Sequence, residues 1–311
     1  MSILLTGCAG FIGSHATDEF LENGYTVVGV DSLTYAGNIE NLKNQRDNPK
    51  FSFYKKDICD TDSILQYCQD YDVKYIVNFA AETHVDNSIR SCDSFIHSNI
   101  NGVKSLLECC RELDIKLFHI STDEVYGSID QHSFYEDDKL SPMNPYSATK
   151  ASAEHLITSY HNTYGVEYII ARPSNNYGPR QNSEKFIPTI LECVLNRRKI
   201  PIYGNGKNIR DWLFVKDNAR AIRFILENSN LNETYNITAS HEMENIEIVN
   251  NIIRYFNLEF DNVAEFVDDR PGHDFRYSIN NDKLLALGFE FDSIFNRNLE
   301  ETIKFYREEI G

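Results

Sequence analysis

Residues 3–13 read Ile-Leu-Leu-Thr-Gly-Cys-Ala-Gly-Phe-Ile-Gly, an apolar run that leads into glycines at every third position. The apolar run predicts a β-strand, and the helical spacing of Ala16, Phe20 and Leu21 predicts a helix that ends near Gly24. A strand, a Gly-x-x-Gly-x-x-Gly turn and a helix bring a helix N-terminus to the pyrophosphate of a dinucleotide. The residues predicted to contact such a cofactor are Gly7, Gly10, Phe11, Ile12 and Gly13.

Asp31 stands at the end of a second predicted strand, residues 26–30, eighteen residues after Gly13. A carboxylate in this position can accept hydrogen bonds from the adenosine ribose of the cofactor. A 2′-phosphate there would meet like charge, so the sequence predicts NAD rather than NADP as the cofactor. The alternative for Asp31 is a purely structural turn residue at the end of the strand.

Strands and helices continue to alternate beyond this unit. Strands are predicted over residues 51–54, 75–79, 117–120 and 167–171, and helices over about 61–71, 92–113 and 145–164. This rhythm is typical of an α/β protein with a Rossmann-type, doubly wound parallel sheet. We predict an NAD-binding domain over residues 1–172 and a smaller α/β substrate-binding domain over residues 173–311. The sequence leaves open whether the chain crosses back to the first domain around residues 216–237.

The carboxyl ends of the later strands carry further candidate contacts, because ligands of open α/β sheets bind in the crevice outside those ends. Asp57-Ile58 follows the third strand and would border the adenine, although a plain turn explains it equally well. Ala80-Ala81 follows the fourth strand, where small side chains let the backbone approach a cofactor closely. Thr83-His84 would overhang the same crevice, although a lone histidine is more often a structural hydrogen-bonding residue.

Acid/base residues gather behind the strand predicted at 117–120, in Ser121-Thr122-Asp123-Glu124-Val125-Tyr126-Gly127. Tyr146 and Lys150 follow on one face of the helix that Asn144-Pro145 begins. An ammonium near a phenol favours the phenolate, so we expect Lys150 to lower the pKa of Tyr146 from about 10. Such a phenolate can take a hydroxyl proton while hydride leaves the same carbon, and Thr122 can hydrogen-bond that oxygen.

Asp123 and Glu124 add a second acid/base pair to this region. The pair can remove a proton from the carbon next to a new ketone and protonate a departing hydroxyl, which is an elimination. The alternative is a solvated turn with acidic residues, but the neighbouring Tyr146 and Lys150 favour chemistry. The predicted catalytic residues are Thr122, Asp123, Glu124, Tyr146 and Lys150.

Composition limits the ligands and the location of the protein. The 311 residues carry 30 basic and 47 acidic side chains, and the net charge of −17 disfavours binding to nucleic acid and anionic membranes. No apolar run approaches the ~20 residues of a membrane helix, and the N-terminus enters the glycine-rich unit directly, so we expect a cytoplasmic protein. The seven cysteines form no Cys-x-x-Cys pair, and we expect no metal site. An anionic ligand must therefore meet a local cluster of Arg and Lys.

Longer motifs give the chain a family resemblance over nearly its whole length. It resembles the extended short-chain dehydrogenases/reductases, and within them the nucleoside-diphosphate-glucose 4,6-dehydratases. The motifs are Thr-Gly-x-x-Gly-Phe-Ile-Gly at 6–13, Ala-Ala-Glu-Thr-His-Val-Asp at 80–86, Ser-Thr-Asp-Glu-Val-Tyr-Gly at 121–127, Tyr-Ser-Ala-Thr-Lys at 146–150, Ser-Asn-Asn-Tyr-Gly-Pro at 174–179, Lys-Phe-Ile-Pro at 185–188, Pro-Ile-Tyr-Gly at 201–204, Arg-Asp-Trp at 210–212 and Asp-Arg-Pro-Gly-His-Asp at 269–274. Related epimerases carry small residues at 123 and 124, and decarboxylases and GDP-mannose dehydratases typically read Thr-Ser-Glu. Asp123 is therefore the discriminating residue.

The resemblance implies an NAD-dependent lyase that acts on UDP-glucose or dTDP-glucose. Tyr146, supported by Lys150 and Thr122, would oxidise C4 of the sugar while NAD takes the hydride. Glu124 would remove the C5 proton, Asp123 would protonate the leaving C6 hydroxyl, and the hydride would return to C6. Cofactor contacts would extend to Tyr146, Lys150 and Asn176. The residues implied around the nucleotide sugar are Thr83, His84, Asn175, Lys185, Tyr203, Arg210, Asn245, Arg270 and His273.

Other functions stay open beside this reading. The Asp123-Glu124 pair argues against a 4-epimerase or decarboxylase, and the intact Thr122, Tyr146 and Lys150 argue against a non-catalytic NAD-binding regulator. Residues 81–88 and 144–150 look closer to the dehydratase domains of UDP-rhamnose synthases, whereas the motifs at 174–179 and 210–212 look like the dTDP enzymes; we lean slightly to UDP-glucose. The resemblance also implies a homodimer built on the helices at about 92–113 and 145–164, and a step towards rhamnose or another deoxysugar.

Overall fold

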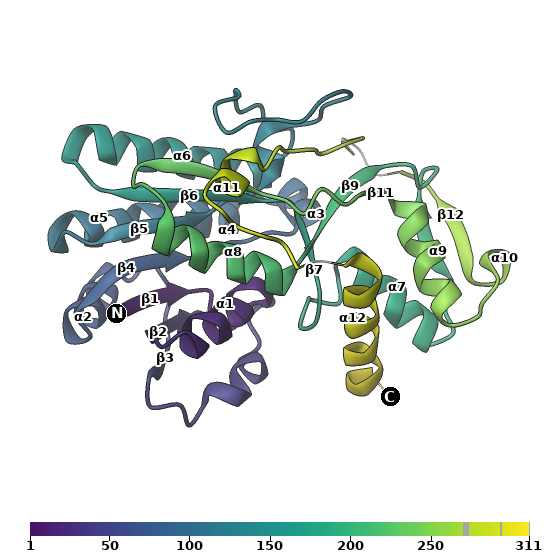
Figure 1. The fold of residues 1–311 in the computed structure, drawn as a ribbon, viewed down its shortest axis with the longest axis horizontal. Coiled ribbons are helices and arrows are strands. Elements are labelled where there is room, and N and C mark those ends of the chain that lie inside the picture. Colours follow the sequence, from purple (N-terminus) through teal and green to yellow (C-terminus); the bar gives the residue numbers. More distant parts are fainter. Residues whose placement is uncertain (270–273, 293, 311) are drawn as a thin grey trace.

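A parallel sheet of seven strands lies at the centre of the protein (Figure 1), in the order β10-β6-β5-β4-β1-β2-β3. The structure, a computed structural model, describes residues 1–269, 274–292 and 294–310. The strands are β1 (Ser2–Thr6), β2 (Thr26–Asp31), β3 (Phe51–Lys55), β4 (Val73–Asn78), β5 (Lys116–Ile120), β6 (Tyr168–Pro173) and β10 (Glu233–Ile237). Every neighbouring pair is parallel. The predicted Rossmann-type, doubly wound α/β fold is therefore confirmed.

The strand order reverses between β1 and β4. The chain runs outward from β1 through β2 to β3 and then returns to β4 on the other side of β1. In open α/β sheets, ligands bind at such a reversal, outside the carboxyl ends of the strands. The glycine-rich turn after β1 and the loop after β4 therefore face the same crevice.

Alternate side chains of β1 feed two hydrophobic cores, because successive side chains of a strand point to opposite faces of the sheet. Ile3 and Leu5 pack with α1 (Phe11–Glu22), η1 (Ile39–Gln45) and α8 (Val215–Asn228) on one face. Leu4 packs with α2 (Thr61–Asp70), α5 (Val103–Leu113) and α6 (Pro145–Tyr164) on the other face. All three strand residues are fully buried, so the sheet is covered by helices on both sides.

The continuous helix predicted over 92–113 is wrong in its middle. The chain forms α4 (Asp93–Phe95), a π-helical segment η2 (Ile96–Gly102) and then α5. A π turn widens the helix and often occurs at functional sites. Here it directs Asn99 to the loop after β4, where its amide accepts from the Glu82 N–H at 2.9 Å and donates to Thr149 Oγ1 on α6 at 2.9 Å. Helix α3 (Val85–Arg90), which we did not predict, begins in that loop.

A second group of elements lies beside the central sheet (Figure 1). Strand β9 (Ile209–Phe214) pairs with β7 (Asn175–Tyr177) and β11 (Glu242–Glu244), and β8 (Ile200–Tyr203) pairs with β12 (Ala264–Val267). The helices of this group are α7 (Phe186–Leu195), α9 (Asn245–Tyr255), α10 (Phe260–Val263) and α12 (Phe295–Ile310). Tyr177, Trp212 and Ile248 belong to its own hydrophobic core, and each is at most 4% exposed.

The chain beyond residue 173 also adds to the central sheet. Helix α8 packs against α1, and β10 then pairs with β6 along its whole length. Helix α11 (Asp282–Ala286) lies against β10. The division into residues 1–172 and 173–311 stays a prediction. None of the helices in the described part of the chain combines the length and apolar composition that a bilayer-spanning segment requires.

Candidate active site

Two adjoining hollows form one crevice at the carboxyl ends of β1 and β4. The first, of about 210 Å³, is lined by Asp31, Asp57-Ile58 and Ala80. The second, of about 240 Å³, is lined by the predicted catalytic residues together with Phe11, Ile12, Gly13, Thr83, Asn175, Asn176 and Lys185. Gly7, Gly10 and Ala81 line both hollows. An elongated crevice of this kind suits a dinucleotide with a second ligand at one end.

The glycine-rich turn has no room for a side chain at Gly7 or Gly13. Gly7 has a φ of +67°, and a Cβ on it would lie 2.7 Å from the Ala80 nitrogen. A Cβ on Gly13 would lie 2.1 Å from the Gly7 carbonyl oxygen. Gly10 precedes α1 without a side-chain cap, so the first N–H groups of the helix remain available to an anion. The turn therefore fits a pyrophosphate against the N-terminus of α1.

Asp31 ties the end of β2 to the glycine-rich turn. Its Oδ2 accepts a hydrogen bond from the Ala9 N–H at 2.9 Å, and its Oδ1 accepts one from the Leu33 N–H at 2.8 Å. A carboxylate has about four acceptor positions, so capacity remains for ribose hydroxyls. Burial raises the pKa of Asp31 above its ordinary value. The structural and the cofactor roles weighed for Asp31 are therefore compatible.

Asp57 at the other end of the first hollow has a partner that the sequence did not suggest. His97 Nε2 lies 2.9 Å from Asp57 Oδ2, and His97 Nδ1 lies 3.9 Å from Cys59 Sγ. These three residues are the one group of metal-ligating type found in the described ranges. The two partners contact different nitrogens of the same ring and so orient the imidazole.

The five predicted catalytic residues lie together in the second hollow. Asp123 and Glu124 belong to η3 (Asp123–Tyr126), which Thr122 caps by accepting from the Glu124 N–H at 3.3 Å. Asn144 and Ser147 form a capping box that sets the start of α6, and this places Tyr146 and Lys150 one turn apart. Lys150 Nζ donates to the Ile120 carbonyl at the end of β5 at 2.7 Å. Asn144 also donates to Glu124 Oε2 at 3.3 Å, which joins α6 to η3.

The environment of Asp123 keeps its carboxyl group protonated. Burial, followed by the charge of Glu124, raises the pKa of Asp123 to about 8. Thr122 Oγ1 donates to Asp123 Oδ1 at 3.2 Å, whereas Oδ2 has no hydrogen-bond partner among the residues that the structure describes. A protonated, buried carboxyl that lines a hollow is suited to act as a general acid.

The expected lowering of the Tyr146 pKa is wrong for the polypeptide alone. Burial and the nearby carboxylate of Glu124 raise the pKa of Tyr146 above its ordinary value, and a hydrogen bond with Thr122 opposes this. Burial also lowers the pKa of Lys150 to about 8, while the charge of Glu154 raises it. The sequence indicated which groups meet, but it could not weigh burial against the ammonium.

Residues on both sides of the crevice meet at its rim. Lys185 Nζ donates to the Thr83 carbonyl at 3.2 Å, and His84 Nε2 lies 3.8 Å from Glu184 Oε2. His84 also caps α3 through Nδ1, which accepts from the Asn87 N–H at 3.3 Å. His84 lines neither hollow. The loop after β4 is thereby joined to the segment that leads into α7.

Two asparagines line the second hollow from β7. Asn176 is held by its neighbours, since its amide donates to the Ser174 carbonyl at 2.9 Å and accepts from Asn218 at 2.9 Å. Asn175 Oδ1 is buried without a hydrogen-bond partner among the described residues. Of the two, Asn175 therefore has the side chain that needs an additional donor.

Three further predicted substrate residues, Arg210, Tyr203 and Asn245, do not line either hollow. Arg210 on β9 is 6% exposed, and its guanidinium donates to the Asp274 carbonyl at 2.9 Å and lies 4.3 Å from the Tyr277 ring centroid. Tyr203 on β8 is 45% exposed, and Asn245 begins α9. Arg270 and His273 lie outside the described residues.

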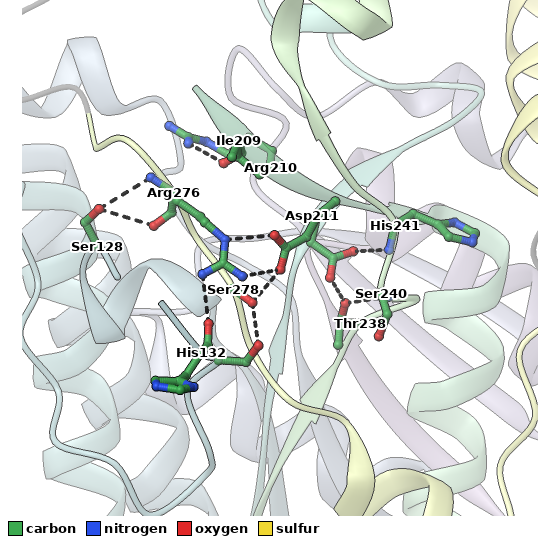
Figure 2. Close-up of polar contacts among 12 residues, drawn as sticks. Ser128, His132, Ile209, Arg210, Asp211, Thr238, Ser240, His241, Arg276 and Ser278 are labelled. Atoms are coloured by element: carbon green, nitrogen blue, oxygen red, sulfur yellow. Dashed lines mark hydrogen bonds and ion pairs between the residues drawn. The ribbon is translucent and has the colours of Figure 1, made fainter. Parts of the chain in front are cut away.

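A buried carboxylate next to Arg210 connects β9 to the central sheet (Figure 2). Asp211 is 1% exposed and accepts hydrogen bonds from Thr238 Oγ1, just after β10, and from the His241 N–H at 3.1 Å. Arg276 joins β11 to the loop after η3, because its guanidinium donates to the Glu242 carboxylate at 2.7 and 2.8 Å and to the His132 carbonyl at 2.8 Å. These contacts fix the sheet that carries Arg210 relative to the crevice.

Sequence reasoning missed a buried ion pair behind the site. Arg172 Nη2 lies 2.6 Å from Glu154 Oε2, and both side chains are at most 6% exposed. One signal was available: Glu154 lies between Ala153 and Ile157 on a helix that packs on the sheet, so it falls next to a buried face. A carboxylate there requires a buried partner.

Comparison with known proteins places this geometry in a family. The family model described as GDP-mannose 4,6 dehydratase matches residues 4–302. The chain belongs to this family. The resemblance predicted from the sequence is therefore confirmed, and with it the prediction of a nucleotide-sugar 4,6-dehydratase, an enzyme of the hydro-lyase class.

Named relatives match the chain over nearly its whole length. It is 43% identical to the low-salt glycan biosynthesis protein Agl12 of Haloferax volcanii, over 98% of both chains. It is 38% identical to the dTDP-glucose 4,6-dehydratase of Haemophilus influenzae, over 98% of both chains. The structure of the dTDP-glucose 4,6-dehydratase DesIV of Streptomyces venezuelae, solved with NAD bound, is 38% identical with a TM-score of 0.96 and covers 99% of this chain and 97% of its own.

Proposed function

We propose that this member of the 4,6-dehydratase family removes water from dTDP-glucose and forms dTDP-4-keto-6-deoxyglucose. The enzyme is an NAD-dependent hydro-lyase. Curated relatives from several bacteria carry the name dTDP-glucose 4,6-dehydratase at 38–41% identity, and they favour the thymine nucleotide. This outweighs the slight lean to UDP-glucose from residues 81–88 and 144–150, because it rests on nearly the whole chain rather than on two short motifs.

The observation that carries the proposal is the pairing of two acid/base sets in one hollow. Tyr146 and Lys150 form the set expected of any enzyme that oxidises a sugar hydroxyl beside NAD. Asp123 and Glu124 form the second set, and the raised pKa of Asp123 makes it a proton donor at neutral pH. An epimerase needs only the first set, whereas elimination of water needs both.

The roles proposed for the chain follow from these positions. Tyr146 takes the proton of the C4 hydroxyl, and Thr122 hydrogen-bonds the same oxygen. Glu124, oriented by Asn144, removes the proton at C5. Asp123 then protonates the C6 hydroxyl as it leaves. When bound, NAD would supply the redox chemistry by accepting hydride from C4 and returning it to C6. Glu124 gives a proton back to C5 as the hydride returns.

The residues that would hold NAD fit it on geometric grounds. The glycine cradle at Gly7 and Gly13 admits a pyrophosphate but no Cβ, and Asp31 keeps acceptor capacity for the ribose. Lys185, Arg210, Arg270 and His273 are the cations proposed to meet the nucleotide diphosphate, since the net charge of −17 requires local compensation. Tyr203 and Asn245 are proposed to lie around the same ligand.

Three broader proposals accompany the reaction. The protein acts as a homodimer through the helices of residues 92–113 and 145–164, works in the cytoplasm, and supplies a 4-keto-6-deoxy sugar for rhamnose or another deoxysugar. The name of the Haloferax relative, a glycan biosynthesis protein, supports a place in glycan assembly.

Parallel turnover assays with dTDP-glucose and UDP-glucose test the proposed substrate. We expect the 4-keto product from dTDP-glucose with a kcat/KM at least ~10-fold higher than from UDP-glucose, a difference of about 1.4 kcal/mol. A preference for UDP-glucose would overturn the nucleotide assignment alone. No keto product from either substrate, with turnover to a C4 epimer instead, would overturn the dehydratase assignment.

A further inference from the structure

Glu154 is fixed by three donors in the interior of the protein. Its Oε1 accepts from Ser121 Oγ at 2.5 Å and from Arg172 Nε at 3.1 Å, and its Oε2 accepts from Arg172 Nη2 at 2.6 Å. The side chain of Glu154 is 4% exposed. Ser121 is the first residue after β5, directly before Thr122. The carboxylate is therefore clamped beneath the start of the catalytic turn.

The other side of the Arg172 guanidinium is held as well. Its Nη1 donates to the Tyr126 hydroxyl at 2.5 Å and to the Glu136 carbonyl at 2.9 Å, and the guanidinium lies 4.7 Å from the Tyr126 ring centroid. Tyr126 donates to Asn236 Oδ1 on β10 at 2.8 Å. Arg172, on β6, thus holds Glu154 from a rigid frame that includes η3 and β10.

Burying such a pair costs free energy of desolvation, and a hydrophobic pair of similar size would often serve stability equally well. A stabilising role is therefore a weak reason for this pair. Its position offers a better one, because Glu154 lies one helical turn beyond Lys150 on α6. Side chains four residues apart on a helix are neighbours.

Apart from Glu154, the surroundings of Lys150 disfavour its charged form. The charged or titratable groups around it are Tyr146 and Glu154 on α6, His119 on β5, Asp123 and Glu124 in η3, and Arg172 on β6. His119 is fully buried, and burial and the charge of Lys150 keep its pKa well below the ordinary range, so it stays neutral. Burial lowers the pKa of Lys150 to about 8, and the charge that raises it is that of Glu154.

We propose that Glu154 is a positioning residue for the reaction: clamped by Arg172 and Ser121, it is the counter-charge that keeps Lys150 an ammonium beside Tyr146. The inference rests on the proposed function, because Lys150 is assigned there to support the Tyr146 base. Glu154 itself does not line the crevice. It acts through Lys150, so its loss should change the titration of Lys150 and not only the stability of the fold.

The test is the titration of Lys150 in the full-length protein labelled with 13C-lysine. The 13Cε signal of Lys150, assigned by its loss in Lys150→Arg, is followed against pH in wild type and in Glu154→Gln. Gln keeps the size of the side chain and removes its charge. We expect the apparent pKa of Lys150 to fall by about one unit or more, the usual effect of losing a nearby opposite charge. The basic limb of the pH dependence of kcat should move to lower pH by the same amount.

Two further variants separate the effect of the Glu154 charge on Lys150 from an effect of the substitution on folding. Tyr126→Phe removes a contact of Arg172 but leaves both charges, so Lys150 should titrate as in wild type. Glu154→Gln combined with Arg172→Met replaces the ion pair by a neutral pair, which guards against poor folding of the single variant. Because the positive charge of Arg172 is lost as well, the pKa of Lys150 should still fall below the wild-type value, but by less than in Glu154→Gln. An unchanged Lys150 titration in either Glu154 variant, or an equal fall in Tyr126→Phe, overturns the proposal. The NMR titration needs no turnover, so it remains decisive even if neither nucleotide glucose is a substrate.

Discussion

Asp123 and Glu124 are consecutive residues of one 3-10 turn, yet their carboxyl groups lie in different environments. Asp123 is 3% exposed and leaves Oδ2 without a hydrogen-bond partner among the described residues, whereas Glu124 accepts a hydrogen bond from Asn144 at 3.3 Å. Neighbouring carboxyl groups in unlike surroundings divide into an acid and a base. The division expected here is Asp123 as the acid and Glu124 as the base.

Glu124→Gln should separate oxidation from elimination. The variant retains Tyr146, Lys150 and Thr122, so hydride can still leave C4, but no base remains for the C5 proton. We expect kcat for the keto product to fall at least ~10²-fold, while reduced nicotinamide absorbance rises on the enzyme when substrate is added. Stopped-flow absorbance after one addition of substrate measures the formation of the keto product and the rise of the reduced nicotinamide.

Tyr146→Phe is the matched control, because it removes one hydroxyl from the same hollow. It should abolish both the absorbance rise and the product. If Glu124→Gln turned over at the wild-type rate, the elimination role of Glu124 would be wrong. If both variants behaved alike, the two acid/base sets would not act in separate steps.

The raised pKa of Asp123 predicts how stability depends on pH. In the folded protein Asp123 keeps its proton up to about pH 8, whereas in the unfolded chain it ionises near its ordinary pKa of 3.8. Folding therefore takes up a proton between these values, so this group lowers the free energy of unfolding as pH rises from about 4 to about 8. Asp123→Asn cannot ionise and should lose less stability over that range.

Thermal unfolding at pH 5 and pH 8 measures this effect. The fall in Tm between the two should be smaller in Asp123→Asn than in wild type by at least about 2 °C, the effect of ~1 kcal/mol in a protein of this size. Asp137→Asn, an exposed residue in the loop beyond η3, is the control and should match wild type. Equal pH dependence in all three proteins would contradict the buried, protonated state of Asp123.

Asp31 should set the choice between NAD and NADP. A 2′-phosphate would lie beside its carboxylate, so NAD should bind at least ~10-fold more tightly, the effect of about 1.4 kcal/mol. Asp31→Asn should lower the ratio of the affinity for NAD to the affinity for NADP. Asp57→Asn, at the other end of the same hollow, should weaken both cofactors to a similar degree. Calorimetric titration of both cofactors measures the ratios, and equal affinity of the wild type for both would remove the role assigned to Asp31.

The parts of the fold that follow from local pattern were predictable. The glycine-rich turn, Asp31 and the start of α6 at Asn144-Pro145 each depend on neighbouring residues, and the structure places them as expected. The π-helical segment η2 was not predictable, because its apolar spacing fits an ordinary helix. Its irregularity depends on Asn99, whose partners come from the loop after β4 and from α6.

The sequence could predict which acid/base residues share the second hollow, but not the pKa shifts that burial causes there. Thr122 to Glu124 and the pair of Tyr146 and Lys150 come from one strand end and one helix start, so motif and order suffice to bring them together. The direction of the Tyr146 pKa depends on burial, which a sequence does not give. Two contacts join elements that are distant in the sequence: the ion pair of Arg172 with Glu154 and the hydrogen bond of Thr238 to Asp211. No local sequence pattern predicts either contact.

Isotope transfer tests the proposed reaction most directly. Hydride leaves C4 and is needed at C6 once water has gone, and a nicotinamide that stayed bound in the crevice would serve both steps. Substrate with deuterium at C4 should therefore give product with deuterium at C6. In heavy water, C5 should gain solvent deuterium through Glu124. Mass spectrometry and NMR of the product locate both labels.

The destination of the label separates the reaction classes that share this fold. An epimerase of the same fold would return the label to C4. A simple dehydrogenase would release it in the reduced cofactor. Either result would overturn the dehydratase reaction while leaving the glycine cradle and Asp31 as an NAD site. The label at C6 is expected here, because Asp123 and Glu124 lie in the same hollow as Tyr146 and can remove water before the hydride returns.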